Sequence, residues 1–434
     1  MIEDGSHPNP RFITGIRLLA LPQSPAGGLP ATPVTCLRNV WIELENGSVR
    51  RIGPEGEPFP IHANRDECFD AGQRLVTPGF VESHTHPVFF QYRQNEFHQR
   101  CQGSTYLEIA AQGGGILSSV RGVRSVSLEE LTRLVRSRFI RFLELGVTTV
   151  EAKSGYGLSV VDEIKSLQAI RNAATDLTEV SPTLLAAHTV PPEHKSAPDK
   201  YVEIVCKEII PRASEENLAD AVDIFVEESA FSIEQAYAVF KAGRDAGLGL
   251  RIHADQFTSS GGASLAAEFG AWSADHMDCT GEREIAKLAE AGVTVVLLPG
   301  AVFFLALNKW APARKFIDAG CKIALSTDFN PGTSPTQSLP LMMTLGCNRL
   351  KMSPAESLWA TTMGGASALR RDSTLGSLLP GYSADLSMWD APDIEYLPYR
   401  FGDSIPKTVF KRGRLASLQG KICADYLMPD PIKK

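Results

Sequence analysis

Eight short apolar runs, separated by longer segments with helical patterning, place the strongest constraint on the fold of this 434-residue chain. The runs are rich in β-branched residues and do not alternate with polar ones, which is typical of parallel strands covered on both faces. They lie at residues 79–86, 147–153, 182–188, 221–228, 248–255, 273–277, 293–299 and 322–328. Eight strands that are each followed by a helix close naturally into a ring. We therefore predict an α/β fold of the (β/α)8 TIM-barrel type.

The helical segments between these runs carry signals for their own beginnings and ends. Capping-box sequences begin at Ser127, Ser232 and Ser353. Glycines stand where four helices should end, at Gly146, Gly247, Gly292 and Gly320. The strand and helix patterns therefore agree on the same alternation.

The two ends of the chain follow a different pattern. Residues 40–49 alternate in polarity around Asn46-Gly47, a strong hairpin signal, and residues 384–389 and 407–413 are typical of short strands. Residues 5–33 are rich in proline and glycine, and we predict a loop there. These patterns predict a small β-sandwich-like domain built from residues 1–78 and 371–434, with the barrel at residues 79–370.

Composition and charge narrow the classes of function. The formal net charge of −7 gives no broad basic field, so neither nucleic acid nor a membrane is an expected partner. No run approaches the roughly 20 apolar residues of a membrane helix, and the apolar stretch at 16–21 is too short for a signal-peptide core. The eight cysteines are scattered, without a CxxC pair. We expect a cytoplasmic enzyme that acts on a small molecule.

Ligand-type side chains fall at the carboxyl ends of the predicted strands, where a TIM barrel builds its active site. The first strand ends in His84-Thr-His86, whose two imidazoles share one face of the strand; the fifth ends near His253 and the eighth at Asp328. Three nitrogens and one carboxylate suit a single Zn²⁺ or Fe³⁺. Alone, His253 is better explained as a core residue and Asp328 as a helix N-cap, but together the four favour a metal.

His188 and His276 end the third and sixth strands. Each is a candidate fifth ligand, proton carrier or hydrogen-bond donor to substrate. The alternative is an imidazole tied to a neighbouring carboxylate such as Asp275 or Glu227. The fourth strand lacks the lysine that bridges two metals in some barrel hydrolases, which favours one metal per subunit.

Longer motifs resemble those of the imidazolonepropionases of the amidohydrolase superfamily over nearly the whole chain. They are PGFVESHTHPV (78–88), EAKSGYG (151–157), AHTVPP (187–192), HADQ (253–256), LLPGA (297–301) and TDFNPG (327–332). The resemblance implies His84, His86, His253 and Asp328 as the metal ligands. It implies substrate-binding positions at Arg93, Tyr156, His188, Gln256, Asn330, Gly332 and Thr333, and a homodimer, which is common in the family. The Met363-Gly-Gly segment departs from the more usual Ile-Asn-Ala.

The implied reaction is hydrolysis of the ring C–N bond of 4-imidazolone-5-propanoate to N-formimidoyl-L-glutamate during histidine breakdown. A metal-activated water would attack the ring carbonyl, His188 or His276 would stabilise the oxyanion, and Asp328 would move the proton. Arg93 would form a two-pronged contact with the propionate, and Gly332 would let the backbone approach the ligand. Gln256 would orient the ring.

Two alternatives to this function remain at this stage. Deaminases on the same scaffold generally place a glutamate three residues after the fifth-strand histidine, where this chain has Gln256, which cannot donate a proton as an acid. A non-catalytic barrel would be indicated by a lost metal ligand, and none is lost.

Overall fold

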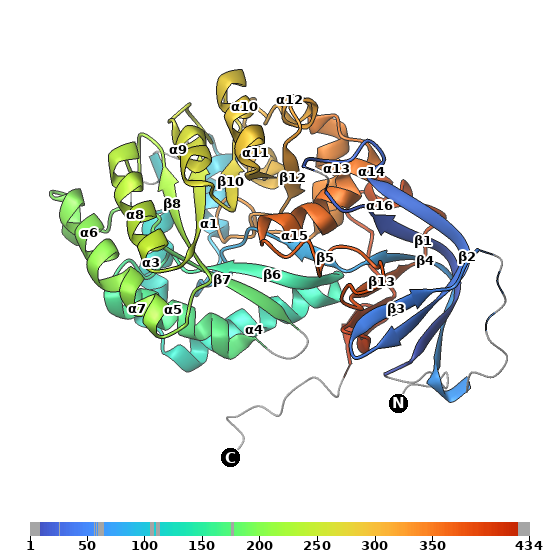
Figure 1. Cartoon of the computed structure of the whole chain (residues 1–434). Coiled ribbons are helices and arrows are strands. Elements are labelled where there is room, and N and C mark those ends of the chain that lie inside the picture. Colours follow the sequence, from blue (N-terminus) through green and yellow to red (C-terminus); the bar gives the residue numbers. More distant parts are fainter. Residues whose placement is uncertain are drawn as a thin grey trace, which may run out of the picture.

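An eight-stranded parallel sheet, curled into a barrel, forms the larger part of the molecule (Figure 1). This computed structural model describes residues 9–25, 27–55, 57, 59, 65–104, 108–109, 113–174 and 178–423. The barrel strands run in chain order as β5 Phe80–Glu82, β6 Val147–Lys153, β7 Glu179–Ala187, β8 Ala221–Val226, β9 Gly249–Ala254, β10 Ser273–His276, β11 Thr294–Leu297 and β12 Lys322–Leu325. All eight predicted strands are present, and the barrel prediction is confirmed.

The first and last barrel strands meet through the residues that follow them. The hydroxyls of Ser83 and Ser326 lie 2.7 Å apart, and the Thr327 amide donates to the Glu82 carboxylate at 3.2 Å. These contacts bring the carboxyl ends of β5 and β12 side by side, although they are more than 200 residues apart in the chain.

Helices cover the outside of the barrel (Figure 1). The longer ones are α1 Gln94–Cys101, α3 Ile116–Ser125, α4 Leu128–Glu144, α5 Val160–Ala173, α8 Ile233–Asp245, α9 Gly262–Phe269, α10 Glu282–Ala291 and α13 Leu339–Leu350. Shorter helices are α6 Pro198–Ile204, α7 Ile210–Glu215, α11 Pro299–Phe304, α12 Ala313–Asp318, α14 Pro354–Trp359, α15 Gly365–Ala368 and α16 Tyr396–Tyr399. Full capping boxes form at Ser232 and Ser353, whereas Ser127 accepts only the amide of Glu130.

The second sheet is built from both ends of the chain, as predicted (Figure 1). Its spatial order is β16-β15-β14-β13-β4-β1-β2-β3. The strands are β1 Phe12–Pro22, β2 Val34–Glu45, β3 Ser48–Ile52, β4 Cys68–Pro78, β13 Leu386–Trp389, β14 Thr408–Lys411, β15 Arg414–Leu418 and β16 Lys421–Ile422. The boundaries predicted after residues 78 and 370 stay predictions, although β4 and β5 belong to different sheets.

The prediction of a loop over residues 5–33 was wrong for its central part. Residues 12–22 form β1, which pairs antiparallel with β2 and parallel with β4. The prolines and glycines that suggested a loop lie mainly outside β1, whereas Ile13, Leu19 and Leu21 inside it are buried in the core of the small sheet. Hydrogen bonding to two neighbouring strands and burial of these side chains stabilise a strand here, although the surrounding segment has the composition of a loop.

The glycines at 364 and 365 have a packing explanation. They lie where a helical turn at Ala360–Gly364 continues into α15. A Cβ atom at Gly364 would overlap the carbonyl oxygen of Ile323 in β12, and one at Gly365 would overlap that of Val81 in β5. The two glycines therefore let the helix pack closely against the strands that precede His84 and Asp328. Two helical glycines cost roughly 1–2 kcal/mol relative to alanines.

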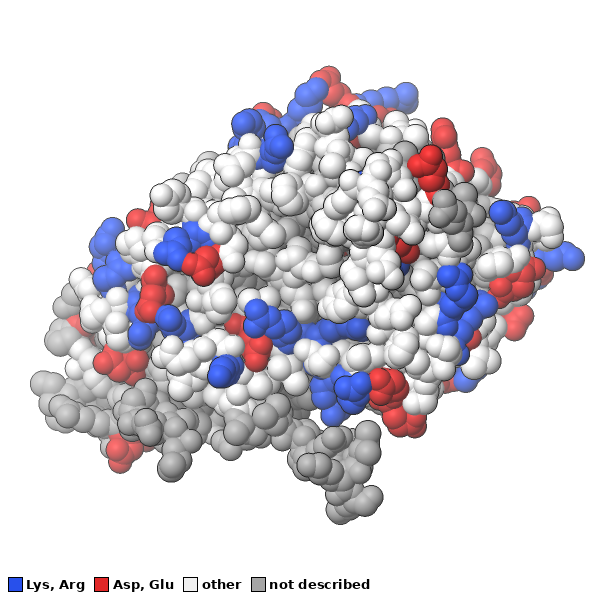
Figure 2. All heavy atoms as spheres, turned by 180° about the vertical axis from the view of Figure 1, so that it is seen from behind, with Lys and Arg blue, Asp and Glu red and all other residues white. Residues whose placement is uncertain are grey.

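The described helices include none that is both long and apolar enough to cross a membrane. Basic and acidic side chains lie interspersed over the face of the molecule in Figure 2.

Candidate active site

Three imidazoles and one carboxylate converge at the carboxyl end of the barrel. The Nε2 atoms of His84 and His86 lie 3.3 Å apart, and the Nε2 atoms of His86 and His253 are also 3.3 Å apart. The Oδ1 atom of Asp328 lies 3.6 Å from His84 Nε2 and 3.4 Å from His86 Nε2. All four residues are buried. The structure thus brings together the four residues that the sequence placed at three different strand ends.

Two carboxylates fix the direction of two of these imidazoles, those of His84 and His253. His84 Nδ1 lies 2.7 Å from Asp275 Oδ2, and His253 Nδ1 lies 3.0 Å from Asp223 Oδ1. Because an ionised carboxylate only accepts hydrogen bonds, each pairing places the ring hydrogen on Nδ1 and leaves a lone pair on Nε2. The Nε2 lone pairs of His84 and His253 and the Asp328 carboxylate therefore face the same space, an arrangement that suits a cation.

The spacing of the ligand atoms fits a metal ion. Zinc–nitrogen bonds of about 2.0–2.1 Å in a tetrahedron give edges of about 3.3–3.4 Å between ligand atoms, close to the 3.3–3.6 Å found among His84, His86 and Asp328. Burial, followed by nearby positive charge, lowers the pKa of His84 and His86 well below the usual value for histidine. Both rings are therefore neutral, as metal binding requires.

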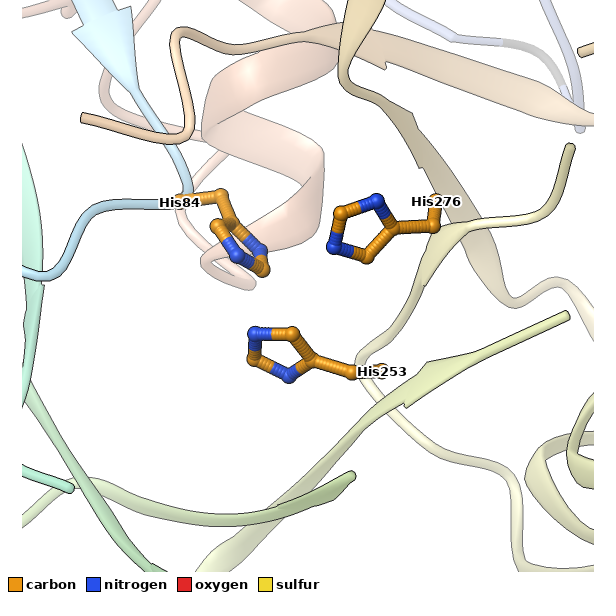
Figure 3. A group of neighbouring side chains, drawn as sticks. All are labelled: His84, His253 and His276. Atoms are coloured by element: carbon orange, nitrogen blue, oxygen red, sulfur yellow. The ribbon is translucent and has the colours of Figure 1, made fainter. Parts of the chain in front are cut away.

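His276 approaches the same centre from β10. Figure 3 shows the rings of His84, His253 and His276 turned toward one another, and these three form a second group of possible ligands. Burial lowers the pKa of His276 to about 3. Its Nδ1 has no hydrogen-bond partner within the described part of the chain; the nearest carboxylate oxygen, Asp278 Oδ2, is 4.0 Å away.

The backbone is strained at two of these positions. The φ angles are +76° at His276 and +52° at Asp328, in the left-handed region that residues other than glycine rarely adopt. Such strain persists where surrounding contacts hold it, and it is frequent at functional sites.

A cavity of about 560 Å³ lies against the cluster. Of the predicted substrate-binding residues, it is lined by Arg93, Tyr156, His188, Gln256, Asn330 and Thr333. Lys195 and Phe225 also line it, and sequence analysis did not identify either. In the structure Phe225 is a partly buried side chain in a strand whose other residues are buried, a difference that the sequence does not show.

Arg93 is a buried cation with unused donors. Its Nε and Nη1 atoms have no hydrogen-bond partner among the residues that the structure describes, and Nε lies 3.5 Å from Glu96 Oε2. A Cβ atom at Gly332 would overlap the guanidinium group. The absence of a side chain at Gly332 therefore makes room for Arg93, whereas the sequence had suggested room for the ligand itself.

Asn330 uses its amide within its own loop. Its Nδ2 donates to the Asp328 carbonyl and to Thr333 Oγ1, both at 2.7 Å, while its Oδ1 accepts from the amides of Gly332 and Thr333. Two donors and two acceptor sites are all that an asparagine amide has. In this structure Asn330 shapes the loop beside Arg93.

His188 has a backbone partner. Its Nδ1 lies 2.9 Å from the carbonyl oxygen of Gly155, and because a carbonyl only accepts, the hydrogen is on Nδ1. Burial lowers the pKa of His188 well below its usual value, so the ring is neutral and its Nε2 is an acceptor. The alternative carboxylate partners lie elsewhere: Asp275 contacts His84, and Glu227 accepts the amide of Phe257.

A buried lysine stands behind the carboxylates. Lys153, the last residue of β6, has a fully buried side chain, and its Nζ lies 2.9 Å from both Glu151 Oε1 and Asp223 Oδ2 and 3.8 Å from Asp275 Oδ2. Burial opposes the charge of Lys153, but the three carboxylates outweigh it and raise the lysine pKa. The sequence signal for this group was a glutamate and a lysine two residues apart, Glu151 and Lys153, in a strand with no other charged residue.

Comparison with known proteins agrees with this geometry. The amidohydrolase family model matches residues 75–416. An imidazolonepropionase of Alkaliphilus metalliredigens is 41% identical over 92% of this chain and 95% of its own length, and one of a Geobacillus species (strain WCH70) is 44% identical over 89% and 91%. The chain belongs to the imidazolonepropionases, within the amidohydrolase family. It is therefore a hydrolase.

Solved structures add information on the fold alone. Guanine deaminase of E. coli superimposes with a TM-score of 0.71 at 17% identity, covering 94% of this chain and 99% of its own. The 5-methylcytosine deaminase of Klebsiella pneumoniae gives 0.73 at 17% identity, covering 94% and 97%. At this identity the likeness extends to the barrel and the small sheet, and it carries no information on substrate.

Proposed function

We propose that this member of the imidazolonepropionases hydrolyses the ring C–N bond of 4-imidazolone-5-propanoate to N-formimidoyl-L-glutamate in histidine breakdown. One observation carries the proposal: a ligand set for a metal lines the same cavity as a buried arginine that has donors without a hydrogen-bond partner among the described residues. The substrate needs both, because its ring amide must be attacked at one end while its propionate carboxylate is bound at the other.

His84, His86, His253 and Asp328 would hold one Zn²⁺ or Fe³⁺ per subunit, since three imidazoles and a carboxylate suit either ion. Such an ion supplies Lewis acidity and makes water a nucleophile near neutral pH. The deep burial of these four residues keeps the reacting groups in a region of low dielectric, where charge interactions are strong.

Arg93 anchors the substrate in this proposal. Its Nη1 has no hydrogen-bond partner among the described residues, so the guanidinium group would donate to the propionate carboxylate and fix its distance and orientation. Gly332 leaves space for the guanidinium group, and Asn330 with Thr333 holds the loop beside it. Tyr156 and Gln256 line the same cavity and would contact the ring.

The two extra histidines divide their roles according to their hydrogen-bond partners. Neutral His188 has its hydrogen committed to Gly155, so it accepts a hydrogen bond from a ring N–H of the substrate. His276 has no such commitment at Nδ1 among the described residues, so it can carry its hydrogen on Nε2 and donate to the developing oxyanion. Asp328, whose pKa burial raises, moves the proton to the leaving nitrogen.

Deamination is disfavoured by Gln256, which lines the cavity at the place where an acid would be needed and cannot supply a proton. The test is to incubate purified protein with imidazolone propionate, follow loss of the ring's ultraviolet absorbance, and measure metal in the same sample. We expect ring opening and one equivalent of metal per chain. Two equivalents, full activity after removal of metal, or ammonia release from a purine or pyrimidine ring instead would contradict the proposal.

We also propose a cytoplasmic homodimer. The family resemblance supports the dimer, and eight free cysteines, two of them exposed, agree with a reducing compartment. Light scattering of purified protein tests the dimer, since a monomer mass would contradict it.

A further inference from the structure

The buried ammonium of Lys153 has three carboxylate neighbours, and each leads to a different part of the metal site. An ammonium has three N–H donors in a compact group. Two of the neighbours, Glu151 and Asp223, lie at 2.9 Å, and the third, Asp275, lies at 3.8 Å. The three come from β6, β8 and β10, so the ammonium connects alternate strands of the barrel.

The contacts beyond these carboxylates reach the side chains of two histidine ligands and the backbone beside the third. Asp223 accepts from His253 Nδ1, and Asp275 accepts from His84 Nδ1. Glu151 accepts the backbone amide of Thr85, the residue between His84 and His86, at 3.0 Å. Carboxylates that receive the distal N–H of a metal-binding imidazole set its orientation and basicity.

We propose that Lys153 is a positioning residue of the metal site: it holds the carboxylates of Asp275, Asp223 and Glu151 so that the rings of His84 and His253 and the backbone before His86 keep one geometry. This inference rests on the metal site of the proposed function and deepens it. Without the ammonium, three carboxylates would remain buried together with fewer positive partners, and their mutual repulsion would move them apart. The imidazoles attached to them would follow.

The chain provides a matched control, the equally buried Lys411. Its Nζ lies 2.8 Å from Glu179 and 2.5 Å from Asp385, at the junction of the barrel and the small sheet and away from the histidines. Lys153→Met and Lys411→Met each remove one buried ammonium from a group of carboxylates. A loss of stability that comes only from burying unpaired carboxylates should therefore appear in both variants.

The test measures metal binding without reference to turnover. Metal-free wild type, Lys153→Met and Lys411→Met are titrated with Zn²⁺ against a chromophoric chelator, and the visible absorption of the Co²⁺ form reports ligand geometry. We expect Lys153→Met to weaken zinc affinity by about 10–100-fold and to alter the cobalt spectrum. Lys411→Met is expected to lower the melting temperature only. Wild-type zinc affinity and cobalt spectrum in folded Lys153→Met would overturn the proposal.

If Lys153→Met does not fold, Lys153→Arg tests the positioning role of Lys153 instead. It keeps the charge but replaces the compact ammonium with a planar fork, so we expect a folded protein with severalfold weaker zinc affinity. Unchanged affinity and spectrum in that variant would overturn the proposal. Failure of wild type itself to bind zinc or iron would instead contradict the metal site of the proposed function, which keeps the two failures distinct.

Discussion

Two groups in this molecule each consist of a buried lysine with carboxylate neighbours. They differ in whether nearby side chains still offer atoms that could bind a cation. At the barrel centre, two carboxylates beside Lys153 contact His84 and His253, whose Nε2 lone pairs face the same space as the Asp328 carboxylate. At the junction with the small sheet, Lys411 is contacted by Glu179 and Asp385, and Arg371 and Arg412 also pair with Glu179. The first group requires a cation to be complete. The second is complete as it stands, so its effect should be confined to stability.

The largest expected effect comes from removing one predicted metal ligand at the barrel centre. His253→Ala should remove both metal and activity, because a three-ligand remnant loses affinity as well as geometry. Metal analysis of the purified variant, beside the ring-opening assay, measures this. A variant that stays active without metal would show that the converging histidines serve another purpose. Lys411→Met, assayed in parallel, should remain active.

The next effect distinguishes two neighbours of the metal. Asp328→Asn should lower the rate by about 10²-fold or more, because the amide cannot take up a proton. Gln256→Glu should keep measurable hydrolysis with an altered pH profile, since a new titrating group joins the cavity. Metal content must accompany the rates, because loss of metal would mimic loss of the proton carrier. Normal turnover of metal-replete Asp328→Asn would reassign proton transfer, with His276 as the first candidate.

Arg93 differs from Lys411 in the same way as the two groups differ. Among the described residues, Arg93 has a donor without a hydrogen-bond partner, whereas Lys411 contacts both Glu179 and Asp385. Arg93→Lys keeps the charge but loses the two-pronged contact, so kcat/KM should fall by about 10–100-fold, the loss of one charge-assisted hydrogen bond, and Arg93→Ala should fall further. Lys207, exposed on its helix, provides a control through Lys207→Ala, which should leave kcat/KM unchanged. Wild-type efficiency in both Arg93 variants would refute the substrate pose.

The smallest expected effect is on acid stability and comes from the second group. Burial opposes ionisation of Glu179, but Lys411, Arg371 and Arg412 outweigh it and lower its pKa from 4.5 to about 2. Its contribution is therefore fully present above pH 4.5 and is lost as the pH falls toward 2. Urea unfolding of wild type and Glu179→Gln should show a gap at pH 7 that narrows across this window. A gap that does not change with pH would mean that charge at Glu179 does not stabilise the junction.

The sequence alone determined the barrel, the order of its strands and the residues at their ends. Eight apolar runs with helices between them leave few alternatives, and parallel strands bring their carboxyl ends to one face, so His84, His86, His253 and Asp328 had to be neighbours. Helix ends were equally local: Gly146, Gly247, Gly292 and Gly320 all adopt positive φ, as their positions implied. The strand at residues 12–22 was missed because prolines and glycines surround it, whereas its ladders to β2 and β4 form only in the folded chain.

Only the tertiary structure decided which carboxylate contacts which histidine or lysine. Asp275 stands beside His253 in the register of β9 and β10, yet its carboxylate binds His84 across the barrel. Its sequence neighbour His276, the partner that adjacency suggested, keeps a free Nδ1 among the described residues. Patterns along a chain report which face of a strand a residue occupies, whereas contacts across a closed barrel depend on how far each side chain reaches. The network around Lys153 is of this second kind, so it became visible only in the folded molecule.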